Sequence, residues 1–106
     1  MERGIGAYDV KSSFEKQILA QFNCDVVQRN KGLDGVMRWK INNKGLGIKI
    51  QKVSESIEEA AQLLELAMSK KDFEYSLLIK TSPKAADIRN QNIIVLPLAR
   101  QIQGEN

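Results

Sequence analysis

The chain has 106 residues, with 16 lysines and arginines against 13 acids and a net charge of +3. This length suits one domain with its own core, and 42% apolar with 27% charged residues is typical of a folded chain. The sequence contains no histidine, which excludes Ser-His and Cys-His catalysis and the usual zinc sites. A single cysteine, Cys24, excludes an internal disulfide and favours a reducing compartment. With no apolar run of membrane-spanning length and no signal peptide at its start, we expect a cytoplasmic protein without a membrane partner.

The first half of the chain predicts one helix and three strands. Residues 1–8 are expected to form a loose segment ahead of a single domain over residues 9–103. Ser12 and Glu15 form the S-x-x-E pattern of a capping box, and an apolar stripe carries the predicted helix to about residue 22. The next elements are a strand over residues 24–28 and two strands, over residues 33–41 and 45–52, joined by the turn sequence Asn-Asn-Lys-Gly.

The second half predicts a helix between strands. Ser56 and Glu59 form another capping box, and helical spacing of apolar residues continues to about residue 70. A continuous apolar strand over residues 75–81, a short helical turn within residues 82–92 and a last strand over residues 92–98 follow. The order α-β-β-β-α-β-(short α)-β predicts a domain of the α/β (α+β) class, with a mixed sheet of about five strands flanked by helices.

Charge is unevenly distributed along the chain. Residues 28–52 hold one acid, Asp34, against seven basic residues: Arg29, Lys31, Arg38, Lys40, Lys44, Lys49 and Lys52. Residues 53–69 hold four glutamates and no base. This asymmetry favours a one-sided contact with a polyanion.

Alternation along the two hairpin strands predicts which side chains share a face. Met37, Trp39 and Ile41 fall on one side of the first strand, where Trp39 is expected in the core. The opposite side of the hairpin would collect the polar residues Asp34, Arg38, Lys40, Lys49 and Gln51. The simplest interpretation of such a set is the solvated face of an antiparallel hairpin; the alternative is a functional site.

The element order, with Glu15 in the first helix, Gly-Leu-Asp-Gly at residues 32–35 and Ile-Lys-Ile-Gln-Lys at residues 48–52, resembles the PD-(D/E)XK nuclease superfamily. Archaeal Holliday-junction resolvases and Mrr-like restriction endonuclease domains are the most similar members. The resemblance covers most of residues 10–98, rests mainly on the order of the elements, and implies a restriction-endonuclease-like fold. In that family a helix glutamate, a strand aspartate and an acid-x-lysine pair surround one or two divalent cations, which polarise a phosphodiester and activate a water.

By position, the resemblance assigns Glu15 to the helix acid and Asp34 to the strand ligand. It places Lys49 where the second strand acid belongs and Gln51 where the catalytic lysine belongs. Lys49 brings a fixed positive charge to a cation site, so we expect an Asp34–Lys49 ion pair and a vestigial or divergent catalytic site without a cofactor. Glu15 and Asp34 would bind magnesium only if activity survives. Each also has a structural interpretation, Glu15 as a capping residue and Asp34 as a turn residue.

Two other assignments bear on catalysis. Lys52 as the catalytic lysine is disfavoured, because it lies in phase with Ile50 and has no acid two residues earlier. A migrated acid stays open, since Glu55 or Glu59 at the start of the second predicted helix could lean toward Asp34.

The resemblance and the charge pattern together predict a domain that binds nucleic acid, DNA rather than RNA, without cleaving it. The predicted phosphate contacts are Arg38, Lys40 and Lys49, with Arg29, Lys31 and Lys44 at the margins. The alternatives are an active divergent magnesium-dependent endonuclease and a small protein-interaction or accessory module. A homodimer or a larger parent protein is compatible with each of them.

Overall fold

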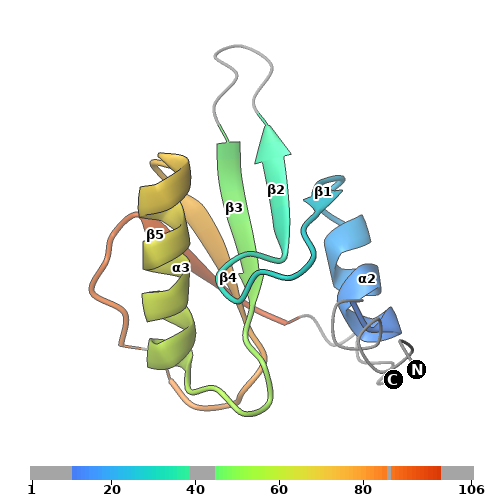
Figure 1. Cartoon of the computed structure of the whole chain (residues 1–106). Coiled ribbons are helices and arrows are strands. Elements are labelled where there is room, and N and C mark those ends of the chain that lie inside the picture. Colours follow the sequence, from blue (N-terminus) through green and yellow to red (C-terminus); the bar gives the residue numbers. More distant parts are fainter. Residues whose placement is uncertain (1–10, 39–44, 86, 99–106) are drawn as a thin grey trace, which may run out of the picture.

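The computed structural model describes residues 11–38, 45–85 and 87–98, which contain one five-stranded sheet (Figure 1). Its strands are β1 (Asp25–Val26), β2 (Gly35–Arg38), β3 (Gly45–Ile50), β4 (Ser76–Lys80) and β5 (Ile93–Pro97), and they lie side by side in this order. β1, β2 and β3 form an antiparallel meander, while β4 and β5 run parallel to β3. The predicted α+β architecture with a mixed sheet is therefore confirmed.

The predicted hairpin is present. Gly35 pairs with Ile48 and Arg38 pairs with Gly45, in antiparallel register. The expected turn between these strands falls in residues 39–44, outside the described part of the chain. Parallel pairing of β3 with β4 requires a crossover, and the helix α3 (Ile57–Lys71) supplies it.

Both helices begin at the capping boxes that the sequence predicts. α2 (Ser13–Ala20) starts after Ser12, whose hydroxyl accepts a hydrogen bond from the Glu15 amide at 3.1 Å while the Glu15 carboxylate accepts one from the Ser12 amide at 3.0 Å. α3 starts after Ser56 with the same reciprocal pair to Glu59. α2 ends at Ala20, slightly earlier than the apolar stripe predicts.

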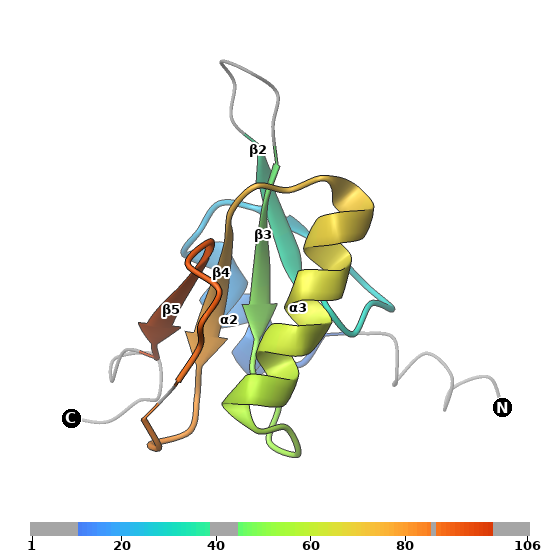
Figure 2. The same cartoon turned by 90° about the vertical axis from the view of Figure 1, so that its left-hand side faces the viewer.

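The two helices cover different core clusters (Figure 2). α3 packs on Leu33, Val36 and Leu78, and α2 contributes Ile18 and Leu19 to a second cluster. That second cluster includes Leu46, Ile48, Ile50 and Ile79. Both sides of β3 are thus buried, and the prediction of a solvated hairpin face is wrong for its described residues. The reason is that β3 lies at the centre of the sheet, where each side is covered by a helix.

The segment between β4 and β5 differs from the prediction of a short helical turn. Its described residues, 81–85 and 87–92, contain bends and a turn but no helix. Near its end, the Asn90 side chain accepts a hydrogen bond from the Asn92 amide at 2.9 Å, which closes the backbone locally as an Asx turn. None of the helices in the described ranges is long and apolar enough to cross a bilayer.

Candidate functional site

Asp34 lies at the entrance to β2 and is almost completely buried, with 1% of its surface exposed. Its position is fixed by the backbone, because its amide donates to Ile48 O at 2.7 Å and its carbonyl accepts from the Val27 amide at 2.9 Å. The Ile50 amide donates to Asp34 Oδ2 at 2.7 Å. The side-chain ammonium of Lys11 contacts Asp34 Oδ1. The carboxylate is therefore held from two directions inside the fold.

Lys52 joins this carboxylate to the first helix. Its Nζ atom lies 2.8 Å from Asp34 Oδ1 and 2.9 Å from Glu15 Oε2. Glu15 is in place because the capping box fixes it in the first turn of α2, one turn before the buried Ile18 and Leu19. Glu15, Asp34, Lys11 and Lys52 form what we call the carboxylate–lysine cluster.

The pKa values of Asp34, Glu15 and Lys52 follow from these contacts. Burial alone would raise the pKa of the Asp34 carboxyl, but the hydrogen bonds from Ile50, Lys11 and Lys52 outweigh burial and lower it. The pKa of Glu15 is also lowered. Burial would raise it, but the contacts with Lys52 and the Ser12 amide outweigh burial. For Lys52, burial would lower the pKa, yet the two carboxylates raise it above its ordinary value. Each group is thereby held in its charged form.

Lys49 does not join this cluster, and the expected Asp34–Lys49 ion pair is replaced by another. Lys49 is fully buried, and its Nζ atom donates to Lys31 O at 2.8 Å and lies 3.2 Å from Glu55 Oε1. Glu55 does lean back from the start of α3, as the migrated-acid alternative anticipates, but it reaches Lys49 and the Lys52 amide. Glu59 stays in its capping box. Burial lowers the pKa of Lys49, although Glu55 and Asp34 counteract part of this effect.

Gln51 is also buried, and its polar atoms are used for structural contacts. Its Nε2 atom donates to Glu55 O at 3.0 Å, and its Oε1 atom accepts from the amides of Thr81 and Ser82 at 2.9 and 3.1 Å. Gln51 therefore ties the end of β3 to the segment that leaves β4. In this arrangement it is not aimed at Asp34.

The donor set of the cluster does not fit a divalent cation. Each described carboxylate oxygen that would face the ion already contacts an ammonium or an amide group. Among the described residues, no group of three or more acids and cysteines is placed to hold a metal. The Lys52 ammonium group contacts both Glu15 and Asp34 instead.

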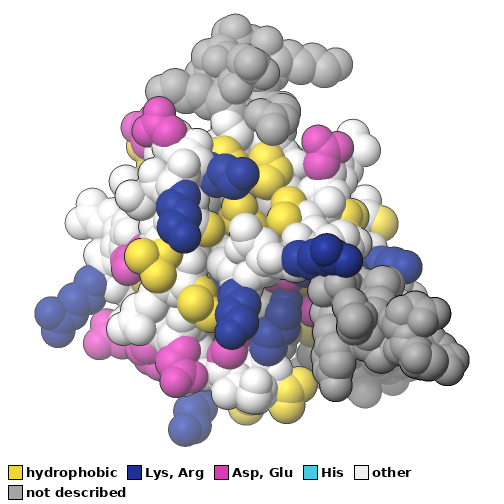
Figure 3. Space-filling view, viewed as in Figure 1, with side chains coloured by type: hydrophobic (Ala, Val, Ile, Leu, Met, Phe, Trp, Pro, Cys, Tyr) yellow, Lys and Arg dark blue, Asp and Glu magenta, His cyan; other side chains and the backbone are white. Residues whose placement is uncertain are grey.

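The predicted phosphate contacts lie in different surroundings. Arg29 and Lys31 are exposed on the loop before β2, whereas the burial of Lys49 keeps its ammonium from reaching a phosphate in this structure. Lys40, Lys44 and Trp39 fall outside the described residues, as does the side chain of Arg38. Exposed Lys70 and Lys71 at the end of α3 add positive charge near Arg29 and Lys31. Figure 3 shows lysine and arginine side chains distributed over this face, with hydrophobic side chains between them.

The interpretation of the sequence included Glu15 and Asp34, disfavoured Lys52 and did not consider Lys11. Lys52 carried a usable signal: it lies in phase with Ile50, on the side of β3 that packs against α2, where Glu15 is located. Lys11 precedes the first helix, and nothing in its spacing relates it to Asp34. Comparison of the chain with protein-family models, with curated proteins and with solved structures gave no significant match.

Proposed function

We propose that this chain is a nucleic-acid-binding domain with a nuclease-like fold that does not cleave its ligand. The observation that carries the proposal is the contact of one ammonium group, Lys52 Nζ, with both Glu15 and Asp34. These are the two acids to which the resemblance assigns metal ligation. Their convergence favours the nuclease-like layout, and their neutralisation by lysines favours the loss of metal-dependent cleavage.

The sheet gives the proposal further support. The resemblance implies an antiparallel meander followed by a crossover helix and two more strands, and β1 to β5 with α3 have this arrangement. A resemblance in layout bears on ancestry more than on activity. Support for binding comes instead from the surface charge.

Positive charge on the surface supports binding to a phosphate backbone. The chain carries a net charge of +3, and within the described ranges no ion pair joins Lys31, Lys70 or Lys71 to an acid. By contrast, the acids Glu15, Asp34 and Glu55 are occupied with internal lysines. Unpaired surface lysines are the groups that supply salt-dependent affinity for nucleic acid, and we propose DNA as the ligand.

The test measures binding and cleavage on the same samples. Labelled single-stranded and duplex DNA are titrated with the protein at low salt in a chelator, and magnesium or manganese is then added. We expect binding in the chelator and intact DNA after the metal is added. Metal-dependent cleavage that Asp34→Asn abolishes would show an active divergent nuclease instead. No binding at low salt would favour the protein-interaction module.

A further inference from the structure

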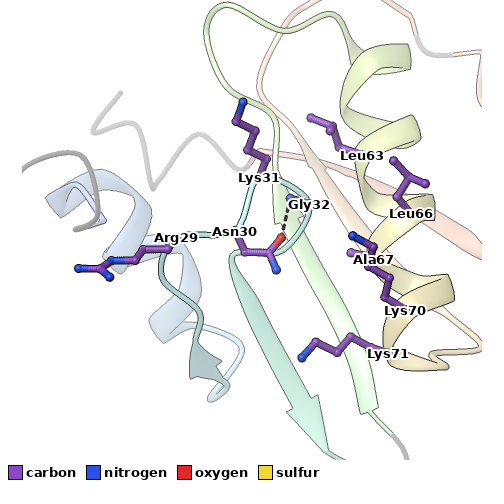
Figure 4. A pocket seen from close by; sticks show the side chains of 9 residues that line it. All are labelled: Arg29, Asn30, Lys31, Gly32, Leu63, Leu66, Ala67, Lys70 and Lys71. Atoms are coloured by element: carbon purple, nitrogen blue, oxygen red, sulfur yellow. Dashed lines mark hydrogen bonds between the residues drawn. The ribbon is translucent and has the colours of Figure 1, made fainter. Parts of the chain in front are cut away.

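A pocket of about 260 Å³ lies between the loop at residues 29–32 and the C-terminal half of α3 (Figure 4). The helix contributes Leu63, Leu66, Ala67, Lys70 and Lys71 to its wall. Figure 4 shows the Lys70 and Lys71 side chains reaching from α3 toward the side of the loop, while the Arg29 side chain extends toward α2. The pocket is separate from the carboxylate–lysine cluster, whose residues do not line it.

The loop wall of this pocket is held in one conformation by contacts with buried groups. Asn30 Oδ1 accepts hydrogen bonds from the amides of Gly32 and Leu33 at 2.8 and 3.1 Å. Buried Lys49 donates to Lys31 O at 2.8 Å. Gly32 lies so close to α3 that an added Cβ atom would come within 2.4 Å of Leu63 O. The loop is therefore already ordered in the folded chain, and ligand binding does not have to supply the free energy of ordering it.

The charged side chains that line the pocket are all cationic. They are Lys31, Lys70 and Lys71, together with Arg29, whose side chain extends away from the pocket (Figure 4); the described lining includes no carboxylate. The C-terminal end of α3 carries about half a negative unit charge, which explains part of the preference for Lys70 and Lys71 but leaves a clear positive excess. Lys31 lies in the loop before β2 and not on α3, so the negative end of the helix does not explain its presence at the pocket. Such an excess attracts an anion.

The rest of the wall is apolar. Leu66 is 61% exposed, and it lies beside Leu63 and Ala67 on the same side of the pocket. A duplex keeps its bases stacked inside and presents mainly sugars and phosphates to a protein. A single strand offers an unstacked base or sugar next to each phosphate, which can cover an apolar wall.

We propose that this pocket binds a short stretch of single-stranded nucleic acid. Lys70, Lys71 and Lys31 each contact a different phosphate of the strand, and Leu63 and Leu66 contact a nucleoside between them. Lys49 is a positioning residue that holds Lys31 through its backbone carbonyl. This inference rests on the proposed function and specifies its ligand and its place on the surface.

The experiment compares two double variants with equal charge change. Lys70→Ala/Lys71→Ala removes two pocket lysines, and Lys16→Ala/Lys84→Ala removes two exposed lysines elsewhere. Binding to an oligothymidylate of about 12 nucleotides and to a duplex is measured by fluorescence anisotropy over a range of salt. Each phosphate contact on a single strand contributes a slope of about −0.7, so losing two contacts should weaken binding about 25-fold at 0.1 M salt. The slope should flatten by about 1.4 units in the pocket variant only.

A third variant, Leu66→Ser, tests the apolar wall. It should weaken single-strand binding about fivefold without changing the salt slope, because an apolar contact releases no counterions. Duplex binding should change little. Thermal unfolding of each variant checks that the fold is intact, which is expected for substitutions at exposed positions.

The outcomes separate this inference from the function on which it rests. If the unmodified protein binds no nucleic acid at low salt, both are overturned. If it binds but both double variants lose affinity equally, the pocket is not the site and only this inference fails. Equal effects of Leu66→Ser on single strands and duplex would overturn the assignment to single strands.

Discussion

Lys52 contacts two carboxylates through one ammonium group, with Asp34 at 2.8 Å and Glu15 at 2.9 Å. Asp34 keeps Lys11 as a second partner, whereas Glu15 has only capping contacts besides Lys52 among the described residues. Removing Lys52 would leave a buried carboxylate with less compensation. At the residue scale, the balance of the cluster therefore depends on this side chain.

We predict that Lys52→Met lowers the free energy of unfolding by about 1–2 kcal/mol, because it deletes two charge-assisted hydrogen bonds. The estimate is at the low end for a buried pair, since 35% of the Lys52 side chain is exposed. Urea unfolding at neutral pH measures the change, with Lys84→Met as the control at an exposed position. Equal stability of the two variants would show that the cluster contributes nothing.

A second prediction concerns the stability of the fold at low pH. Against burial, hydrogen bonds from Ile50, Lys11 and Lys52 lower the pKa of Asp34 in the folded chain, and contacts with Lys52 and the Ser12 amide lower the pKa of Glu15. A carboxyl with a lowered folded pKa stabilises the fold above its unfolded pKa, and this contribution is lost as pH falls through the folded pKa. Stability should thus be constant near neutral pH and fall below about pH 4.

Urea unfolding between about pH 7 and pH 2 checks this dependence. Asp34→Asn should flatten the acid slope, because it removes one of the two titrating groups. A loss of stability that begins near pH 6, or an unchanged slope in the variant, would contradict the assigned contacts.

At the scale of elements, the contact between the loop at residues 29–32 and α3 is tight. A Cβ atom at Gly32 would lie 2.4 Å from Leu63 O and 3.0 Å from the Ala67 Cβ atom. Because the nearest atom belongs to the backbone of a helix, it cannot move aside without disturbing α3.

We predict that Gly32→Ala destabilises the fold by about 1–3 kcal/mol, as expected for overpacking at a close backbone approach. Ser69→Ala, at an exposed position of the same helix, is the control and should be neutral or slightly stabilising. Thermal and urea unfolding measure both variants. If Gly32→Ala is as stable as the control, the loop is not packed against α3 as described.

The sequence predicts the elements well because their signals are local. The two capping boxes give the starts of α2 and α3, and alternation gives β2 and β3 with their antiparallel pairing. Alternation also assigns side chains of β3 to faces correctly, but it cannot say what covers each face. Lys49 and Gln51 are polar and alternate with isoleucines, a pattern that predicts a solvent-exposed face. In the structure both side chains are buried by α3 and the loop that precedes it.

The site is less predictable than the fold, because its contacts join distant segments. Glu15 and Asp34 were identified only through the resemblance in element order, and the structure brings them to one ammonium group. The choice between Lys49 and Lys52 as partner of Asp34 depends on which side of β3 the Asp34 side chain faces. That choice is made by tertiary contacts, including the hydrogen bond from the Ile50 amide.

At the scale of the whole molecule, internal and surface charges have different roles. Three carboxylates, Glu15, Asp34 and Glu55, are paired with three lysines, Lys11, Lys49 and Lys52, inside or at the edge of the fold. This arrangement neutralises most of the buried charge. Cationic side chains remain at the surface around the loop at residues 29–32 and the end of α3, where they line one pocket and raise the local positive potential.

The most direct test of nucleic-acid binding is the salt dependence of affinity for a single strand, measured with the unmodified protein in a chelator. Contacts from Lys31, Lys70 and Lys71 predict a linear fall of log affinity with log salt and a slope of about −2, at about −0.7 per contact. A slope near zero, or no binding at the lowest salt, would contradict the proposed function.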